Sequence, residues 1–309
     1  TFLGLTAMIA PPRAGVTESV MTCKRAGITP VMITGDHKVT AMAIAKEIGI
    51  CGEKDEAITG DEMDKINDKE LEKRSCSIKV YARVNPGHKL RIVKALKKNG
   101  YVVAMTGDGV NDAPALKEAD IGIAMGKSGT EVAKEAASMI LLDDNFNSIV
   151  KAVEEGRIIY DNIRKFIRYL LSCNLGEILM MFVATAINMT LPLVPLQILW
   201  VNLVTDGLPA LALGVDPPDP DIMERPARST DEGIFSRGLG PHILFSGLII
   251  GASSLASFSL TQYLSGGNID MARTVAFATL IVAELLNALE CRSEVHTVFE
   301  VGIFKNKYL

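Results

Sequence analysis

Two patterns of hydrophobic and polar residues divide the chain. Up to about residue 145, short apolar runs alternate with amphipathic stretches of helical spacing. Strands alternating with helices in this way are typical of parallel β-α-β units in a layered α/β domain. The expected strands are residues 3–9, 29–33, 77–82, 101–105, 121–125 and 138–142, and the expected helices are 14–26, 38–49, 88–100 and 130–138.

Two further features complete this first region. Gly27, Gly49 and Gly100 each follow a helical run, where a glycine commonly caps the C-terminus of a helix. The polar stretch 53–75 is expected to form a solvated surface helix with loops, and it carries no assigned function.

After residue 145 the pattern becomes helical without a clear break up to about residue 189. Its second part, residues 166–189, is almost free of charge and spans roughly 35 Å as a helix, which is enough for a bilayer core. Three more apolar stretches cover residues 194–214, 241–264 and 272–291. The sequence therefore predicts four membrane helices, the first of them continuous with a polar stalk.

Basic residues suggest an orientation. They flank the entry to the first span, occur in the connection 215–240 and end the tail, at Arg164, Lys165, Arg168, Arg225, Arg228, Arg237, Lys305 and Lys307. Because cytoplasmic segments carry the excess of Lys and Arg, we expect the soluble domain, the 215–240 loop and the tail to face the cytoplasm.

Composition excludes other classes. The formal net charge of −4 offers no electrostatic reason to expect nucleic acid as a partner. The five cysteines show no Cys-x-x-Cys spacing, so a disulfide framework or a zinc site is not expected.

The stretch "AMTGDGVNDAPALKEAD", residues 104–120, carries the first candidate chemistry. Asp108 and Asp112 lie four residues apart in a turn with Gly107 and Gly109, directly after an apolar strand. Carboxylates and backbone N–H groups at the end of a strand are suited to a magnesium and phosphate site.

A second turn repeats this arrangement. In "VMITGDHKVT" a strand ends at Ile33, and Thr34, Gly35 and Asp36 lead into a helix whose N–H groups attract phosphate oxygens. Asp36 alone could instead be an N-cap. Lys89 begins another helix after a strand; such a lysine is usually solvated, but beside two phosphate-type turns it is a candidate for neutralising a transferring phosphoryl group.

Polar residues inside the predicted membrane helices form the other candidate site, because charge in a bilayer is costly and usually functional. Asn174 and Glu177 share one helix face, as do Asn202, Thr205 and Asp206, and Glu284 lies in the last span. Gly207 and Pro209 should loosen their helix and free backbone carbonyls. This hard-oxygen set suits calcium. Alternatively, the two asparagines only join helices by hydrogen bonds.

The segments "MITGDHKVTAMAIAKEIGI", "ARVNPGHKLRIVKAL", "MTGDGVNDAPALKEADIGIAMGKSGTEVAKEAASMILLDDNF" and "ILWVNLVTDGLPALALG" occur in this order. Together they resemble a P-type cation-transporting ATPase, above all calcium pumps of the sarco/endoplasmic-reticulum type and their bacterial relatives. The resemblance implies a partial haloacid-dehalogenase-like phosphorylation domain with a Rossmann-like parallel sheet over residues 1–145. Residues 146–309 would form the stalk and a transmembrane bundle of four spans.

The resemblance also implies roles. Asp108 matches the magnesium-binding aspartate, with Asn111 and Asp112 shaping the site. Lys89 and Thr34 match groups that contact the phosphoryl group, while Gly35, Asp36 and Arg13 lie around the nucleotide. One departure is Ala10, where relatives usually carry Asp before the two prolines. The implied calcium ligands are Asn174, Glu177, Asn202, Thr205, Asp206 and Glu284.

The family's phosphate acceptor, the Asp of a DKTGT motif, does not occur in this sequence. We therefore expect the chain to be the carboxy-terminal part of a pump, inactive alone. Its partners would be ATP, Mg²⁺, Ca²⁺, the bilayer of a bacterial cell membrane, and the rest of the pump: an actuator domain, a nucleotide-binding domain and four earlier membrane helices.

Three alternatives remain open at this point. The whole protein could transport another cation, or the chain could be a non-catalytic, cation-binding membrane fragment. A membrane-tethered phosphatase would need its own nucleophilic Asp in a DxD motif at a strand end, and none is found.

Overall fold

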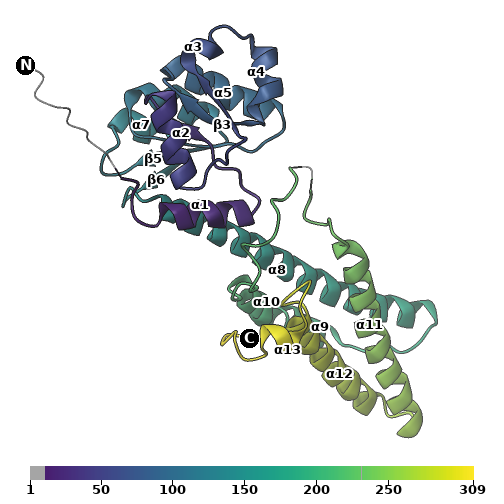
Figure 1. The fold of residues 1–309 in the computed structure, drawn as a ribbon. Coiled ribbons are helices and arrows are strands. Elements are labelled where there is room, and N and C mark those ends of the chain that lie inside the picture. Colours follow the sequence, from purple (N-terminus) through teal and green to yellow (C-terminus); the bar gives the residue numbers. More distant parts are fainter. Residues whose placement is uncertain (1–10, 231) are drawn as a thin grey trace, which may run out of the picture. The chain divides into compact units, whose positions relative to one another are not determined.

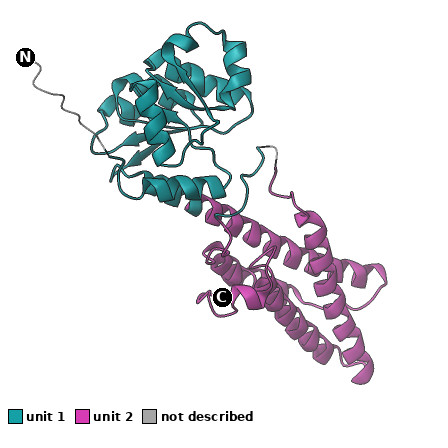
Figure 2. Cartoon of the chain, in the orientation of Figure 1, with its two compact units in different colours: residues 1–154, 223–230 teal, residues 155–222, 231–309 magenta. Residues whose placement is uncertain are grey.

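The computed structural model describes residues 11–230 and 232–309. They group into two compact units, drawn in separate colours in Figure 2: residues 11–154 with 223–230, and residues 155–222 with 232–309. The predicted strand 3–9 and Ala10 lie outside the described residues. A functional domain boundary after residue 145 stays a prediction.

The first unit contains two three-stranded parallel sheets, with strand orders β1-β3-β2 and β4-β5-β6. The α/β class predicted for this region is confirmed. The strands are β1 (Met32–Ile33), β2 (Glu56–Thr59), β3 (Ile78–Ala82), β4 (Ala104–Gly107), β5 (Ile121–Met125) and β6 (Met139–Leu141).

Strand β2 corrects the sequence interpretation of the polar stretch 53–75. That stretch was expected to hold only a surface helix with loops, yet β2 pairs in parallel with β3. Its apolar run is only Ala57-Ile58, and of its four residues only Ile58 is buried. So short a run carries no recognisable strand period.

The helices of this unit follow the amphipathic stretches. They are α1 (Val16–Arg25), α2 (Lys38–Glu47), α3 (Gly60–Met63), α4 (Asp68–Ser75), α5 (Pro86–Lys98), η1 (Val110–Asp112), α6 (Ala113–Glu118) and α7 (Glu131–Ala136). Gly27, Gly49 and Gly100 follow α1, α2 and α5 with φ of 75°, 78° and 82°. The prediction that they terminate helices is confirmed, because this left-handed conformation costs glycine little.

Both sheets share core residues. Ile33 at the end of β1 packs with Tyr81 and Ile92 in one hydrophobic cluster and with Met105 in another. Leu96 of α5 also belongs to both clusters. The carboxyl ends of β1 and β4, which carry the two phosphate-type turns, therefore rest on one continuous core.

The second unit is helical (Figure 1). Its elements are most of α8 (Phe146–Ala186), then α9 (Pro195–Trp200), η2 (Val201–Thr205), α10 (Gly207–Gly214), α11 (Leu239–Leu264), α12 (Ile269–Glu290) and α13 (Val298–Val301). Among the described residues, three segments are long and apolar enough to cross a membrane: Phe146–Ala186, Pro195–Gly214 and Leu239–Leu264. A helix, α12, does cover the fourth predicted span, but its crossing of the membrane stays a prediction.

Glycines bring α8 and α11 into close contact. A Cβ at Gly251 would lie 2.7 Å from the Gly176 carbonyl oxygen, and a Cβ at Gly247 would lie 3.0 Å from the Ser172 carbonyl oxygen. Gly247 and Gly251 are four residues apart on one face of α11. This is the spacing that lets helix backbones approach in membranes.

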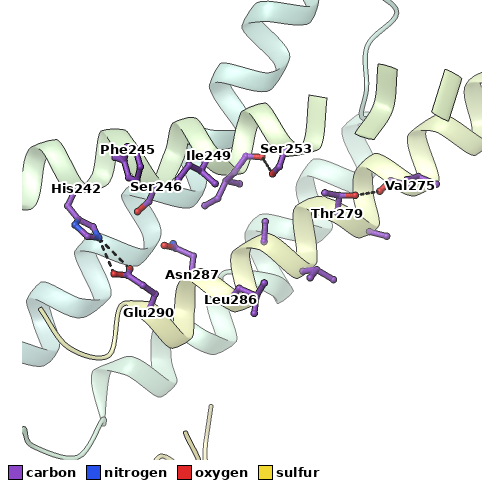
Figure 3. Close-up of a pocket in the computed structure, with 14 residues that line it drawn as sticks. His242, Phe245, Ser246, Ile249, Ser253, Val275, Thr279, Leu286, Asn287 and Glu290 are labelled. Atoms are coloured by element: carbon purple, nitrogen blue, oxygen red, sulfur yellow. Dashed lines mark hydrogen bonds and ion pairs between the residues drawn. The ribbon is translucent and has the colours of Figure 1, made fainter. Parts of the chain in front are cut away.

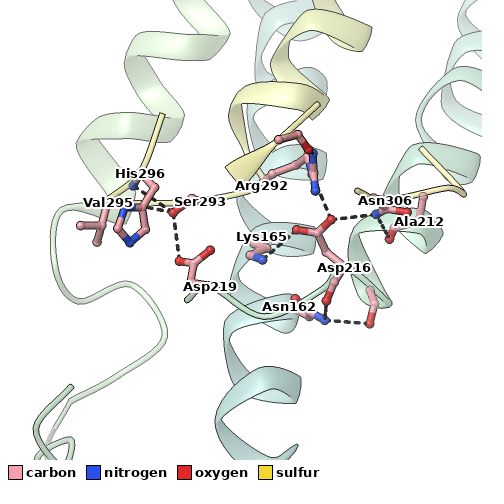
Figure 4. A network of polar contacts seen from close by, with 12 residues as sticks. Asn162, Lys165, Ala212, Asp216, Asp219, Arg292, Ser293, Val295, His296 and Asn306 are labelled. Atoms are coloured by element: carbon pink, nitrogen blue, oxygen red, sulfur yellow. Dashed lines mark hydrogen bonds and ion pairs between the residues drawn. The ribbon is translucent and has the colours of Figure 1, made fainter. Parts of the chain in front are cut away.

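A buried ionic network in the helical unit is centred on Asp216 (Figure 4). The Asp216 carboxylate, after α10, accepts from Lys165 Nζ at 2.9 Å and from Arg292 Nε at 3.0 Å. Asn306 Nδ2 donates to the same carboxylate at 2.8 Å. Asp216 thus joins α8, the segment after α10, the end of α12 and the tail.

Candidate functional site

The loop after β4 is organised by the buried side chain of Asp112. Its Oδ2 accepts hydrogen bonds from the backbone N–H groups of Asp108 and Gly109, each at 3.3 Å. Gly107 leaves no room for a side chain, since a Cβ there would lie 2.5 Å from the Cβ of Asp112. The Gly-Asp-Gly turn therefore curves around the Asp112 carboxylate.

Lys89 reaches this loop from the first turn of α5. Its Nζ lies 2.5 Å from Asp112 Oδ1. Asn85 positions the start of α5, because its side chain accepts from the N–H of His88, whose ring in turn accepts from the N–H of Asn85. The structure thus brings together two candidates, Lys89 and Asp112, that are 23 positions apart.

Asp108 differs from Asp112. Its carbonyl accepts the N–H of Thr130 at 2.9 Å, while its side chain is exposed. Within the described residues no hydrogen bond or ion pair reaches the Asp108 carboxylate. Asn111, in η1, is exposed as well.

This donor set fits magnesium. Both oxygens of Asp112 are engaged, one by Lys89 and the other by backbone N–H groups. Asp108 remains as the available carboxylate, on an exposed loop that water can reach. Mg²⁺ usually keeps several waters and takes only one or two protein carboxylates, so a site centred on Asp108 meets its needs.

The second phosphate-type turn follows β1. Thr34 donates its N–H to the Tyr81 carbonyl at 2.9 Å, and its hydroxyl donates to the Asp36 carboxylate at 2.9 Å. The Asp36 carbonyl accepts the N–H of Arg83 at 3.1 Å. The alternative of Asp36 as an N-cap is wrong, because His37 caps α2. Gly35, exposed between them, has open space where a side chain would be.

Arg13 lies elsewhere in the same unit. Its guanidinium donates to the backbone carbonyl of Asp144, and both residues line a small hollow with Lys127 and Asn145. The N–H of Lys127, followed by that of Ser128, lowers the pKa of the Asp144 carboxyl to about 2. Within the described residues no hydrogen bond or ion pair joins Arg13 to Lys89 or Asp112. Its nucleotide role stays a prediction.

The candidate cation ligands of the helical unit lie near an irregular part of the second apolar segment, Pro195–Gly214. Residues 201–205 form a π-helical turn, η2, in which the Asp206 N–H bonds the Val201 carbonyl at 2.9 Å. Pro209 has no N–H to give to the Thr205 carbonyl four residues earlier. The Tyr169 hydroxyl donates to that carbonyl at 3.1 Å, and to Asp206 Oδ1 at 3.3 Å. The predicted loosening of this helix is therefore observed.

Three carboxylates are buried here. Glu177, Asp206 and Glu284 are 6%, 1% and 0% exposed. Among the described residues, no donor reaches Glu177 Oε1, Asp206 Oδ2 or either oxygen of Glu284. Buried carboxylates without partners are expensive, and a bound cation would match their charge.

The three neutral candidate ligands, Asn174, Asn202 and Thr205, differ in their contacts. Asn202 Nδ2 donates to Glu177 Oε2 at 2.8 Å, linking η2 to α8, as the alternative of an asparagine between helices requires. Asn174 Nδ2 donates to the Leu170 carbonyl of its own helix at 2.8 Å, which leaves its oxygen without a hydrogen bond among the described residues. Thr205 is buried next to Asp206.

Sequence reasoning missed two residues of this cluster, Tyr169 and Cys173. Cys173 Sγ and carboxylate oxygens of Asp206 and Glu284 lie within 4.8 Å of one another. A signal existed, since Tyr169, Cys173 and Glu177 recur every four residues and so share one face of α8.

A separate hollow of about 840 Å³ lies between α11 and α12 (Figure 3). The His242 ring contacts the Glu290 carboxylate at one end, with Nε2 and Oε1 3.2 Å apart, and apolar side chains line most of the rest. None of the six candidate cation ligands lines it.

Comparisons with known proteins match different families to the α/β region and to the helical region. The family described as "Cation transporting ATPase, C-terminus" matches residues 190–309. Families described as haloacid dehalogenase-like hydrolase match residues 2–120 and 89–153. The haloacid-dehalogenase-like class predicted from the sequence is thereby confirmed.

Several relatives match the whole chain. A calcium-transporting ATPase of Bacillus subtilis is 51% identical over 309 residues, which is all of this chain and 35% of the relative. Calcium-transporting ATPase 1 of Lactococcus lactis is 50% identical over 99% of the chain and 34% of its own length. Human calcium-transporting ATPase type 2C member 2 is 45% identical over 99% of the chain and 32% of its own length.

The chain thus spans about a third of the length of the curated relatives that it matches. Within that third it carries the two features described above, a parallel α/β unit and a helical unit with apolar segments. The chain is a membrane protein, and it belongs to the family of P-type cation-transporting ATPases.

Proposed function

We propose that the chain is part of a pump that uses ATP to transport Ca²⁺ across a membrane through an aspartyl-phosphate intermediate. The single observation that carries the proposal is the group of three buried carboxylates with unpartnered oxygens, Glu177, Asp206 and Glu284. Such a group can bind a divalent cation, and Ca²⁺ prefers oxygen ligands. The names of the relatives point to the same ion.

In the α/β unit, the residues of this chain would bind and orient the phosphoryl group. Lys89, fixed by Asp112, supplies a positive charge beside the loop. Thr34 supplies a hydroxyl and Gly35 an open backbone at the second turn. Asp108 would hold Mg²⁺, which when bound neutralises charge on the phosphate oxygens. The acceptor Asp would come from a part of the pump outside this sequence.

In the helical unit, Ca²⁺ is the cargo. Glu177, Asp206 and Glu284 would supply charged ligands, and Asn174, Asn202 and Thr205 neutral oxygens. Two calcium ions carry four positive charges, so three carboxylates here and one from an earlier membrane helix would balance them. Asp206 would bridge both ions, whereas Glu177 and Glu284, together with Asn174, would serve mainly one of the two.

We further propose that the α/β unit, the 215–240 connection and the tail face the cytoplasm of a bacterial cell. The basic residues that border the apolar segments support this orientation. The partners would be the actuator and nucleotide-binding domains and the earlier membrane helices of the same pump.

A pump for another cation and a non-catalytic cation-binding fragment are the competing candidates. The experiment uses the longer protein, assayed for phosphorylation by labelled ATP after acid precipitation. Calcium should switch phosphorylation on, and Asp108→Asn should impair it while equilibrium calcium binding persists. Phosphorylation that depends on another cation would favour a different pump, and a folded longer protein that is never phosphorylated would support the non-catalytic alternative.

A further inference from the structure

One cysteine lies inside the carboxylate cluster of the helical unit. Sγ of Cys173 and carboxylate oxygens of Asp206 and Glu284 lie within 4.8 Å of one another. Cys173 and Glu284 are 0% exposed, and Asp206 is 1% exposed. Sulfur therefore shares a water-poor space with two carboxylates.

Neighbouring side chains orient this thiol. Asn287 Nδ2 lies 3.7 Å from Cys173 Sγ and donates to Ser172 Oγ at 2.8 Å. Cys173 precedes Glu177 by one helical turn on α8, so it points to the same side as that carboxylate.

The side chain of Glu284 separately indicates a ligand-binding site. Both of its carboxylate oxygens are buried, and among the described residues neither has a hydrogen-bond partner. A carboxylate in this state faces the thiol and Asp206 with its full acceptor capacity. The cluster is therefore a set of donors without a ligand, rather than a cysteine packed among apolar side chains.

The chemistry of the three donors differs from that of an all-oxygen site. Calcium and magnesium take hard oxygen ligands, whereas thiolates favour softer metals such as zinc. Tetrahedral coordination with metal–ligand bonds of about 2.0–2.3 Å places donor atoms roughly 3.5 Å apart. The donor atoms lie within 4.8 Å of one another, so metal binding would draw them together by at most about 1.3 Å.

We propose that Cys173 makes this cluster a binding site for soft divalent cations, bound by Cys173 Sγ together with the carboxylates of Asp206 and Glu284. As the metal–sulfur bond forms, the thiol releases its proton to water. Cd²⁺ and Zn²⁺ then occupy the carboxylates that calcium needs and inhibit its binding. The inference rests on the proposed function only in assuming that divalent cations reach this cluster.

The test is a titration of the purified chain in detergent with Cd²⁺, followed by the ultraviolet charge-transfer band of a cadmium–thiolate bond. The wild type should show a saturable band with one thiolate per bound ion. Cys173→Ser should remove it. Cys291→Ser is the matched control, since that cysteine is equally buried in the same unit and should leave the band unchanged. Glu284→Gln should weaken Cd²⁺ binding at least tenfold.

A second measurement uses only the wild-type chain, so misfolding of a variant cannot affect its result. At long reaction times, when transient opening lets buried thiols react with a small methanethiosulfonate, bound Cd²⁺ should slow the modification of Cys173, read by mass spectrometry, and should leave that of the equally buried Cys291 unaffected. No charge-transfer band, a band that survives Cys173→Ser, or no protection of Cys173 would overturn the proposal.

Calcium competition, measured on the longer protein because one calcium carboxylate is expected from outside this chain, separates this inference from the proposed function. If Ca²⁺ binds but no cadmium–thiolate band forms, the inference fails and calcium transport stands. If the band forms through Cys173 but Ca²⁺ neither binds nor competes, the inference stands and the calcium assignment fails.

Discussion

The ammonium of Lys89 and the carboxylate of Asp112 form an ion pair of 2.5 Å between α5 and η1. Asp112 is buried, and its other oxygen holds the backbone of the loop after β4. The pair therefore fixes a positive charge and a phosphate-type turn as one assembly.

The first prediction is that Lys89 and Asp112 act together. In the longer protein, Lys89→Ala should lower the rate of phosphorylation by ATP about 100-fold, the usual size for loss of one group that stabilises transition-state charge. Asp112→Asn should act similarly, and the double variant should lose no more than the worse single variant. Rapid-quench phosphorylation measures all three.

Lys97→Ala is the control for this prediction. Lys97 is on the same helix and forms an ion pair of 3.2 Å with Asp120, but away from the Asp112 loop. Its loss should leave the rate almost unchanged, because Lys97 pairs with Asp120 and not with the Asp112 loop. Fully additive effects of Lys89→Ala and Asp112→Asn would contradict the account.

The second prediction concerns Gly107. Alanine there must displace the Asp112 side chain, because its Cβ would lie 2.5 Å from that of Asp112. Overpacking of this kind costs about 1–3 kcal/mol. Thermal unfolding should show a clear loss for Gly107→Ala and almost none for Gly109→Ala, whose Cβ would be at 3.7 Å from Asp112. Equal losses in the two variants would count against the described loop.

The third prediction tests the contact of α8 with α11. Gly251→Val should force the helices apart, since even a Cβ at Gly251 meets the Gly176 carbonyl at 2.7 Å. Gly176 directly precedes Glu177, so calcium affinity should fall with stability, by about tenfold. Gly240→Val, in the first turn of α11 with no atom within 4 Å of a Cβ, should leave both unchanged. Wild-type calcium affinity in a folded Gly251→Val protein would refute this.

The fourth prediction is a pH dependence set by Asp144. The N–H groups of Lys127 and Ser128 stabilise its charged form and lower its pKa to about 2, from about 3.9 in an unfolded chain. A depressed pKa contributes stability above pH 4 that is lost as the pH falls toward 2.

Asp144→Asn removes that contribution. The wild type should therefore be more stable than Asp144→Asn at pH 6, and the difference should shrink as the pH falls from 4 to 2. Urea unfolding in detergent at fixed pH values measures the difference. A gap that stays constant from pH 6 to pH 2 would show that the Asp144 charge does not matter.

Much of the α/β unit could be predicted because its signals are local. β5 coincides with a predicted run, and β3 is almost entirely buried and apolar, as a strand covered on both faces should be. β2 was missed because its position depends on pairing with β3 and not on its own pattern. The helix start at Lys38 was predicted, but its N-cap is His37, whose ring accepts the N–H of Val39, and not Asp36.

The candidate cation site could also be predicted only in part. The shared face of Asn174 and Glu177 follows from helical spacing within α8. The proximity of Cys173 to Glu284, 111 positions apart, needs the packing of α8 against α12 and could not be read from either segment. The π-helical turn at η2 was foreseen only as a loosening at Gly207 and Pro209.

Equilibrium calcium binding to the purified longer protein tests the central claim most directly. We expect about two calcium ions per phosphorylation site, one of them strongly weakened by Glu177→Gln and both lost in Asp206→Asn. Asp270→Asn, an exposed carboxylate at the start of α12, is the matched control and should bind as the wild type does. Calcium binding that survives Asp206→Asn, or a wild-type ratio near one that Glu177→Gln does not change, would contradict the account.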